Sequence, residues 1–162
     1  MHNNDLVIMG LGQREGDTLA VVSASGDNKA LIRRYIDLVW NQGRSSALQQ
    51  LVDDGFVGHY PAMRHQVRGI SELRQLIARY HSAFSDLHVT IDEQVAEDSR
   101  IATRWTFRGT HDGALGAIPP TGRDVTVTGL SLHQLEADRL CSEWTIFDAL
   151  AIGGQIWAPA AS

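Results

Sequence analysis

The 162-residue chain is poor in several residue types, and each scarcity excludes a class of protein. A single cysteine, Cys141, rules out an intrachain disulfide framework and a cysteine-rich zinc cluster, and it favours a reducing compartment. No apolar run approaches the roughly 18 residues of a membrane span, and the opening MHNNDLVIMG lacks the basic region of a signal peptide. We therefore expect a cytoplasmic protein that does not associate with a membrane.

Basic residues are also scarce. Lys29 is the only lysine, and 14 Lys and Arg against 19 Asp and Glu give a net charge of -5. Because nucleic acids and anionic membranes select basic surfaces, we expect neither as a partner. The seven histidines show no H-E-x-x-H or related spacing, and the chain contains neither a P-loop nor a G-x-S-x-G elbow. The sequence therefore predicts no metal and no cofactor.

The length of 162 residues is typical of one domain, and a content of 43% hydrophobic and 20% charged residues is typical of a soluble globular protein. We place this domain at residues 27–157, between an N-terminal extension over residues 1–26 and a tail over residues 158–162. The extension holds two short apolar runs, LVIMG and TLAVVSA, which form either a hairpin or a loosely ordered segment.

The domain divides into a helical part and a strand-rich part. Apolar residues recur at helical spacing in three segments: residues 27–43, a short stretch near residues 48–52, and residues 70–84. The run FVGHYP predicts a brief strand between the second and third helices. Alternating patterns then predict longer strands in LHVTIDEQV, RIATRWTFRGT, RDVTVTGLSLHQL and RLCSEWTIFDAL.

Helices that are segregated from an antiparallel sheet define an α+β fold. We expect about three N-terminal helices packed on a strongly curved antiparallel sheet. A sheet curved around a long helix forms a cone with an apolar interior, which is where a ligand pocket is expected.

Five segments, taken in order, resemble the SnoaL-like polyketide (ester) cyclases of the NTF2-like superfamily: NKALIRRYIDLVWNQG, FVGHYP, HSAFSDLHVTI, GTHDGALGAIPPTGR and SEWTIFDALAIGGQ. The resemblance spans residues 27–157. It implies an NTF2-like cone, a homodimer through the outer face of the sheet, and a cofactor-independent cyclase or isomerase acting on a polyketide-like or other small carbonyl substrate. The fold also hosts epoxide hydrolases and non-catalytic binding domains, so these functions stay open.

The resemblance makes Asp148 the first candidate for catalysis. In cyclases of the family, an aspartate near the end of the last strand acts as the general acid/base of an aldol closure, and W-x-x-x-D places Trp144 and Asp148 at the matching positions. Strand alternation puts Trp144, Ile146 and Asp148 on one face, where apolar neighbours would raise the pKa of the carboxyl. The structural alternative is that Asp148 caps the following turn or pairs with Arg104 or Arg108.

Two histidines are the next candidates. His59 follows the second helix, where members of the family have a histidine in the cavity, and it would orient a carbonyl or share a proton; a purely structural role is the alternative. If EADR closes a simple hairpin, His133 lies opposite Ser142, about 20 Å from Asp148 at ~3.3 Å per residue. We therefore expect His133 to line the other end of the cavity or the sheet face.

The remaining candidates bind substrate. Trp144, Trp105 and Phe107 would offer aromatic surfaces to a flat or apolar substrate, unless they belong to the core. Arg104 alternates with Trp105, and together with Asp148 it could supply two members of a polar set that activates water for epoxide opening. A non-catalytic ligand holder is the third reading of the same pocket.

Overall fold

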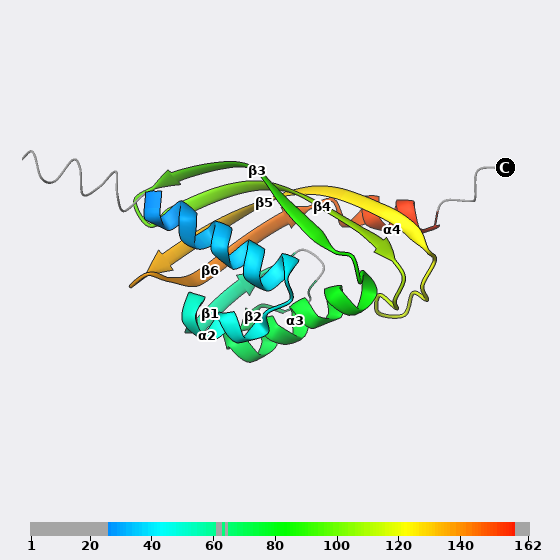
Figure 1. Cartoon of the computed structure of the whole chain (residues 1–162), viewed down its shortest axis with the longest axis horizontal. Helices are drawn as coiled ribbons and strands as arrows, with labels where there is room; N and C mark the ends of the chain where they lie inside the picture. The colour runs from blue at the N-terminus through cyan, green and yellow to red at the C-terminus, as the bar shows by residue number, and fades with distance from the viewer. Residues whose placement is uncertain (1–25, 61–62, 64, 158–162) are drawn as a thin grey trace, which may run out of the picture.

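The computed structural model describes residues 26–60, 63 and 65–157. The predicted tail and all but the last residue of the predicted extension lie outside the described residues. A six-stranded sheet in the order β2-β1-β6-β5-β4-β3 curves over the helices, as Figure 1 shows. This arrangement confirms the predicted α+β fold.

The first helix occupies residues 26–35 and continues as the π-helical segment η1 (Ile36–Asn41). The spacing predicts an inward stripe of Leu31, Tyr35, Leu38 and Val39. Tyr35 and Val39 are buried as predicted, but Ile32 and Ile36 complete the buried stripe, and Leu31 and Leu38 are only half-buried. Gly43 has a φ of 65° just beyond the helix, which is the left-handed backbone that favours glycine at a helix end.

Further helices follow along the described chain. The short helical turn predicted near residue 48 consists of η2 (Ser45–Ala47) and α2 (Leu48–Leu51), and the third predicted helix is α3 (Gly69–Ala83). A helix after the last strand, α4 (Ala149–Trp157), was not predicted. Gln155 of α4 exchanges two hydrogen bonds with the backbone of Thr126, which holds the helix on β5.

The strands are β1 (Val52–His59), β2 (Val67–Arg68), β3 (His88–Glu97), β4 (Arg100–His111), β5 (Arg123–Glu136) and β6 (Arg139–Phe147). Two details differ from the prediction. β1 begins four residues before the expected FVGHYP, and it pairs parallel with β6, so the sheet is not purely antiparallel. In the chain, β2, α3 and the strands β3 to β5 lie between β1 and β6, and a connection of that length allows parallel pairing, which a hairpin turn could not.

The turn between β5 and β6 determines which side chains of β6 point inward. Ala137 and Asp138 both have positive φ, as in a two-residue hairpin turn, and Glu136 pairs with Arg139. The register then shifts between Gln134 and Leu135, so the strand is bulged at Cys141. The predicted pairing of His133 with Ser142 is therefore wrong, since His133 faces Glu143.

The bulge also reverses the alternation along β6, because one extra residue moves every later side chain to the other face. Leu140 is buried before the bulge, and Glu143 and Thr145 are buried after it. Trp144 and Ile146 consequently lie on the outer face, where both are more than half exposed.

Candidate active site

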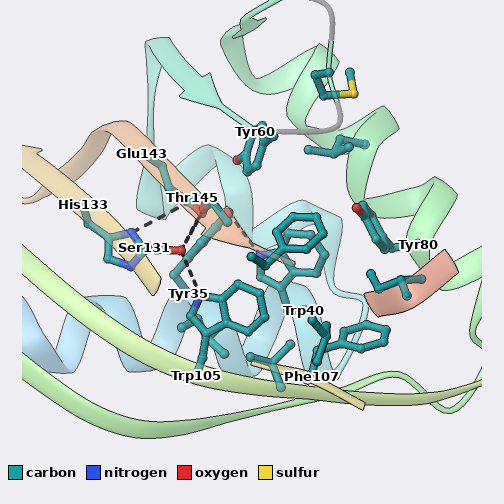
Figure 2. Close-up of a pocket in the computed structure, with 17 residues that line it drawn as sticks. Tyr35, Trp40, Tyr60, Tyr80, Trp105, Phe107, Ser131, His133, Glu143 and Thr145 are labelled. Atoms are coloured by element: carbon teal, nitrogen blue, oxygen red, sulfur yellow. Dashed lines mark hydrogen bonds and ion pairs between the residues drawn. The ribbon is translucent and has the colours of Figure 1, made fainter. Parts of the chain in front are cut away.

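An apolar cavity of about 90 Å³ lies between the concave face of the sheet and the helices. Aromatic side chains supply much of its lining (Figure 2): Tyr35, Trp40, Tyr60, Tyr80, Trp105, Phe107 and Phe147. Ser131, His133, Glu143 and Thr145 form the polar end of this cavity, and all four are less than a tenth exposed. The sequence places them there because β5 and β6 are neighbours and these residues share their inner face.

Glu143 is the acidic residue of the polar end. Its carboxyl accepts a hydrogen bond of 2.7 Å from the Thr145 hydroxyl at Oε1 and a longer one of 3.4 Å from Ser131. Burial raises the pKa of Glu143, and hydrogen bonds from Thr145, Ser131 and Tyr35 offset part of that rise. A carboxyl with a raised pKa can hold a proton and also accept one, which general acid/base chemistry requires.

His133 faces this carboxyl across the β5–β6 pair. Its Nδ1 lies 3.9 Å from Glu143 Oε2, too far for a hydrogen bond. Burial lowers the pKa of His133 to about 3, so the imidazole is neutral over the physiological range.

Several polar atoms at the cavity have no hydrogen-bond partner in the described part of the chain. They are Glu143 Oε2, both ring nitrogens of His133 and the hydroxyl of Tyr60. Buried polar atoms are normally hydrogen-bonded, and an unpaired one costs about 1–3 kcal/mol. A ligand with polar groups at this end of the cavity would supply the missing partners.

The comparisons with known proteins agree with this architecture. The family model for SnoaL-like polyketide cyclase matches residues 30–156, which is most of the chain. The chain belongs to the SnoaL-like polyketide cyclase family. A search of curated proteins finds no match.

Solved structures show the same fold. A SnoaL-like protein from Jannaschia sp. CCS1 aligns with a TM-score of 0.78 at 22% identity, over 84% of this chain and 95% of that one. TsrD from Streptomyces laurentii aligns with a TM-score of 0.73 at 26% identity, over 83% and 97%. A SnoaL-like polyketide cyclase from Agrobacterium tumefaciens C58 aligns with a TM-score of 0.66 at 22% identity, over 80% and 97%.

The structure places Asp148 away from the cavity of this SnoaL-like domain. Asp148 is exposed, and its Oδ1 accepts a hydrogen bond of 2.9 Å from the backbone N–H of Ala151 in the first turn of α4. Its predicted burial beside apolar groups is therefore wrong, because the face that it shares with Trp144 and Ile146 is the outer one. The helix cap that its side chain provides was the structural alternative.

His59 and Trp144 lie together, but also outside the cavity lining. Their rings stack with centroids 3.8 Å apart and an interplanar angle of 13°, since β1 and β6 pair these two residues in register. Both residues were predicted to lie in the pocket, and this is wrong because Trp144 lies on the outer face of the sheet and His59 stacks on it. Tyr60, the residue after His59, reaches the cavity instead.

The substrate-binding candidates on β4 divide by strand alternation. Trp105 and Phe107 line the cavity, and His133 on β5 does so as well. Their role in substrate binding stays a prediction, and their positions are compatible with it. Arg104 lies on the other face, where its guanidinium pairs with Asp92 at 3.3 Å and Glu93 at 3.6 Å. The set of Asp148 and Arg104 expected for epoxide opening is therefore not assembled in the cavity.

The sequence reasoning missed Glu143, Ser131, Thr145 and Tyr60. Within β6 the run E-W-T-I alternates polar and apolar residues, and its polar members, Glu143 and Thr145, are the inward ones. The signal that could have identified them was the pairing of Ser131 and His133 on β5 with two polar positions on β6. That signal depends on the bulge at Cys141, which the sequence pattern does not reveal.

Proposed function

We propose that this protein is a cofactor-independent cyclase or isomerase in which Glu143 acts as the general acid/base on a small carbonyl substrate. The observation that carries the proposal is the buried Glu143 carboxyl at the polar end of an aromatic cavity, with Oε2 lacking a partner among the described residues. Membership of the SnoaL-like polyketide cyclase family supports the same type of chemistry.

The proposed reaction begins with Glu143 as a carboxylate. Oε2 removes a proton from the carbon next to a substrate carbonyl, and the electron pair of the broken C–H bond forms an enolate. In a cyclase the enolate carbon attacks a second carbonyl of the same molecule, and Glu143 returns its proton to the new alkoxide. In an isomerase the proton returns to a different carbon.

Neighbouring groups would hold the substrate during these steps. The Tyr60 hydroxyl lines the cavity without a partner in the described chain, and it can donate a hydrogen bond to the enolate oxygen. The neutral imidazole of His133 can donate from one nitrogen and accept at the other, which suits the hydroxyl of an enol or an aldol product. The aromatic walls exclude water from the enolate.

A proton-exchange assay tests this proposal without knowledge of the natural substrate. 2-Tetralone, a flat neutral ketone, is incubated in D2O, and loss of its C1 protons is followed by NMR. The wild-type protein is expected to accelerate exchange, and Glu143→Gln is expected to lower the rate by about 10²–10⁴-fold. If the wild type accelerates exchange and Glu143→Gln accelerates it equally, Glu143 is not the base.

We also propose that two copies associate through the outer face of the sheet, as the resemblance predicts. That face exposes an apolar patch formed by Leu130 and Leu132 of β5 and by Trp144 and Ile146 of β6, each between 45% and 65% exposed. Register pairs Leu130 with Ile146 and Leu132 with Trp144, so the patch is continuous.

Within the described residues, no helix is both long and apolar enough to cross a membrane.

A further inference from the structure

A chain of hydrogen bonds runs from an indole to the carboxyl of Glu143. Trp105 Nε1 lies 3.0 Å from Ser131 Oγ, Ser131 Oγ lies 2.8 Å from Thr145 Oγ1, and Thr145 Oγ1 lies 2.7 Å from Glu143 Oε1. Figure 2 shows the four side chains along one edge of the cavity. Ser131 and Thr145 are buried, so their hydroxyls have few other partners.

The direction of this chain follows from its first member. An indole N–H can only donate, so Ser131 Oγ accepts from Trp105 and its single proton is left to point onward. That proton reaches Thr145 Oγ1 or, at 3.4 Å, Glu143 Oε1. The Thr145 proton then points to Oε1, which leaves Oε1 as an acceptor only.

We propose that Trp105 is a positioning residue that orders the Ser131 and Thr145 hydroxyls toward Glu143 Oε1, so that the exchangeable proton of Glu143 resides on Oε2. Oε2 is the oxygen that faces His133 and has no hydrogen-bond partner in the described residues. The proposal deepens the role given to Glu143 above and rests on it for the chemistry. The ordering itself can be measured without any substrate.

The indole is held in place by the bare backbone opposite it. Gly129 is the register partner of Trp105 across β4 and β5, and a Cβ on Gly129 would lie 2.3 Å from Cζ2 of the ring. No side chain therefore fits between the ring and β5, and only glycine lets the indole N–H approach Ser131. Gly129→Ala is expected to displace the ring and break the first link of the chain.

Other titratable groups face Glu143, and they stay constant in the proposed variants. His133 approaches from β5 and Tyr60 follows β1, while Tyr35 of the first helix accepts a hydrogen bond from Trp40. Burial raises the pKa of Glu143, and Tyr35 offsets part of this rise, as Ser131 and Thr145 do. These groups set the starting pKa, and the hydroxyl chain is the part that the variants change.

The test is a ¹³C NMR titration of the Glu143 side-chain carboxyl in protein labelled at glutamate Cδ, with Glu143→Gln to assign the signal. Thr145→Val removes the 2.7 Å hydrogen bond and is expected to give the largest rise in the pKa of Glu143. Ser131→Ala and Trp105→Phe are expected to give smaller rises. Thr145→Ser keeps a hydroxyl and serves as the matched control, with the pKa of the wild-type protein.

A double-mutant cycle separates ordering from packing. If Trp105 acts through Ser131, Trp105→Phe raises the pKa in the wild-type background but not in the Ser131→Ala background. An equal effect in both backgrounds would show that the ring acts by packing alone and would overturn the proposal. So would an unchanged pKa in Thr145→Val.

Two controls complete the design. Thermal unfolding of each variant verifies folding, and Trp105→Tyr replaces Trp105→Phe if the latter does not fold. The proposed function and the ordering can fail separately. If only the proposed function is wrong, the wild-type protein will be inactive on 2-tetralone, but Trp105→Phe will still raise the pKa of Glu143 only when Ser131 is present.

Discussion

The stability of the protein in acid should depend on one buried histidine. His133 is almost fully buried, and its folded-state pKa is about 3, against 6.5 for the unperturbed side chain. Between these two values the unfolded chain binds a proton at His133 and the folded protein does not. A lowered histidine pKa therefore contributes no penalty above pH 6.5, and it destabilises the fold progressively as pH falls from 6.5 toward 3.

The size of this effect follows from the same values. One pKa unit corresponds to about 1.36 kcal/mol, so the difference between 6.5 and about 3 implies a loss of about 5 kcal/mol between pH 6.5 and pH 3. About half of it, roughly 3 kcal/mol, falls between pH 6.5 and about pH 4.5. That is a large share of the roughly 5–15 kcal/mol by which typical domains are stable.

Urea unfolding of wild-type protein and His133→Asn at several pH values between about 4.5 and 7.5 measures this loss. The variant is expected to be less stable at pH 7.5, because it leaves a small cavity, but to lose about 3 kcal/mol less than the wild type on acidification. His88→Asn is the matched control, since His88 is exposed at the start of β3, and its curve should run parallel to that of the wild type.

Glu143 contributes with the opposite sign, because its pKa is raised on folding. Repeating the comparison in the Glu143→Gln background isolates His133. The free energy of unfolding is plotted against pH with and without His133, once with Glu143 present and once in the Glu143→Gln background. If the two curves run parallel in both cases, His133 takes up a proton in the folded protein as it does in the unfolded chain. That result would refute the reasoning that burial keeps the imidazole uncharged.

Three further predictions follow from the site and the surface. Glu143→Gln should gain stability relative to wild type as pH rises, since a raised carboxyl pKa stabilises the fold at low pH and this contribution is lost above the folded pKa; thermal unfolding at pH 5 and pH 8 measures it. Ile146→Lys should convert a dimer into a monomer in light scattering after size exclusion, while Val95→Lys, at an exposed apolar residue outside the patch, should not. Asp148→Ala should lower the free energy of unfolding by about 1 kcal/mol through loss of the α4 cap, and Asp148→Asn should not.

The fold was predictable because periodicity and element order are local properties of the sequence. Tyr35 and Val39 have the spacing of a buried helix face, and Trp105 and Phe107 alternate with Arg104 as a half-buried strand requires. The segment of α4 is apolar and holds two adjacent glycines, which weaken helix propensity, so its helix was not evident.

The candidate site was predicted less well because both faces of β6 carry apolar residues. Trp144 and Ile146 resemble a core face, and Asp148 was predicted to lie in the pocket because strand alternation puts it on the same face. Trp144 and Ile146 form part of the face at which we propose that two copies associate, and alternation within one chain does not distinguish such a face from one buried in the core. The bulge at Cys141 determines which side chains of β6 face the cavity. A bulge depends on the pairing of β6 with β5, so it cannot be read from β6 alone.

A direct comparison of two carboxyl variants tests the central claim that Glu143 carries the chemistry. Hydrogen–deuterium exchange at C1 of 2-tetralone is measured for wild type, Glu143→Gln and Asp148→Asn under identical conditions. Asparagine retains the helix cap, so the second variant changes the charge and leaves the fold intact. We expect Glu143→Gln to lose about 10²–10⁴-fold in rate and Asp148→Asn to stay within about twofold of wild type. A large loss in Asp148→Asn together with full activity in Glu143→Gln would contradict the account.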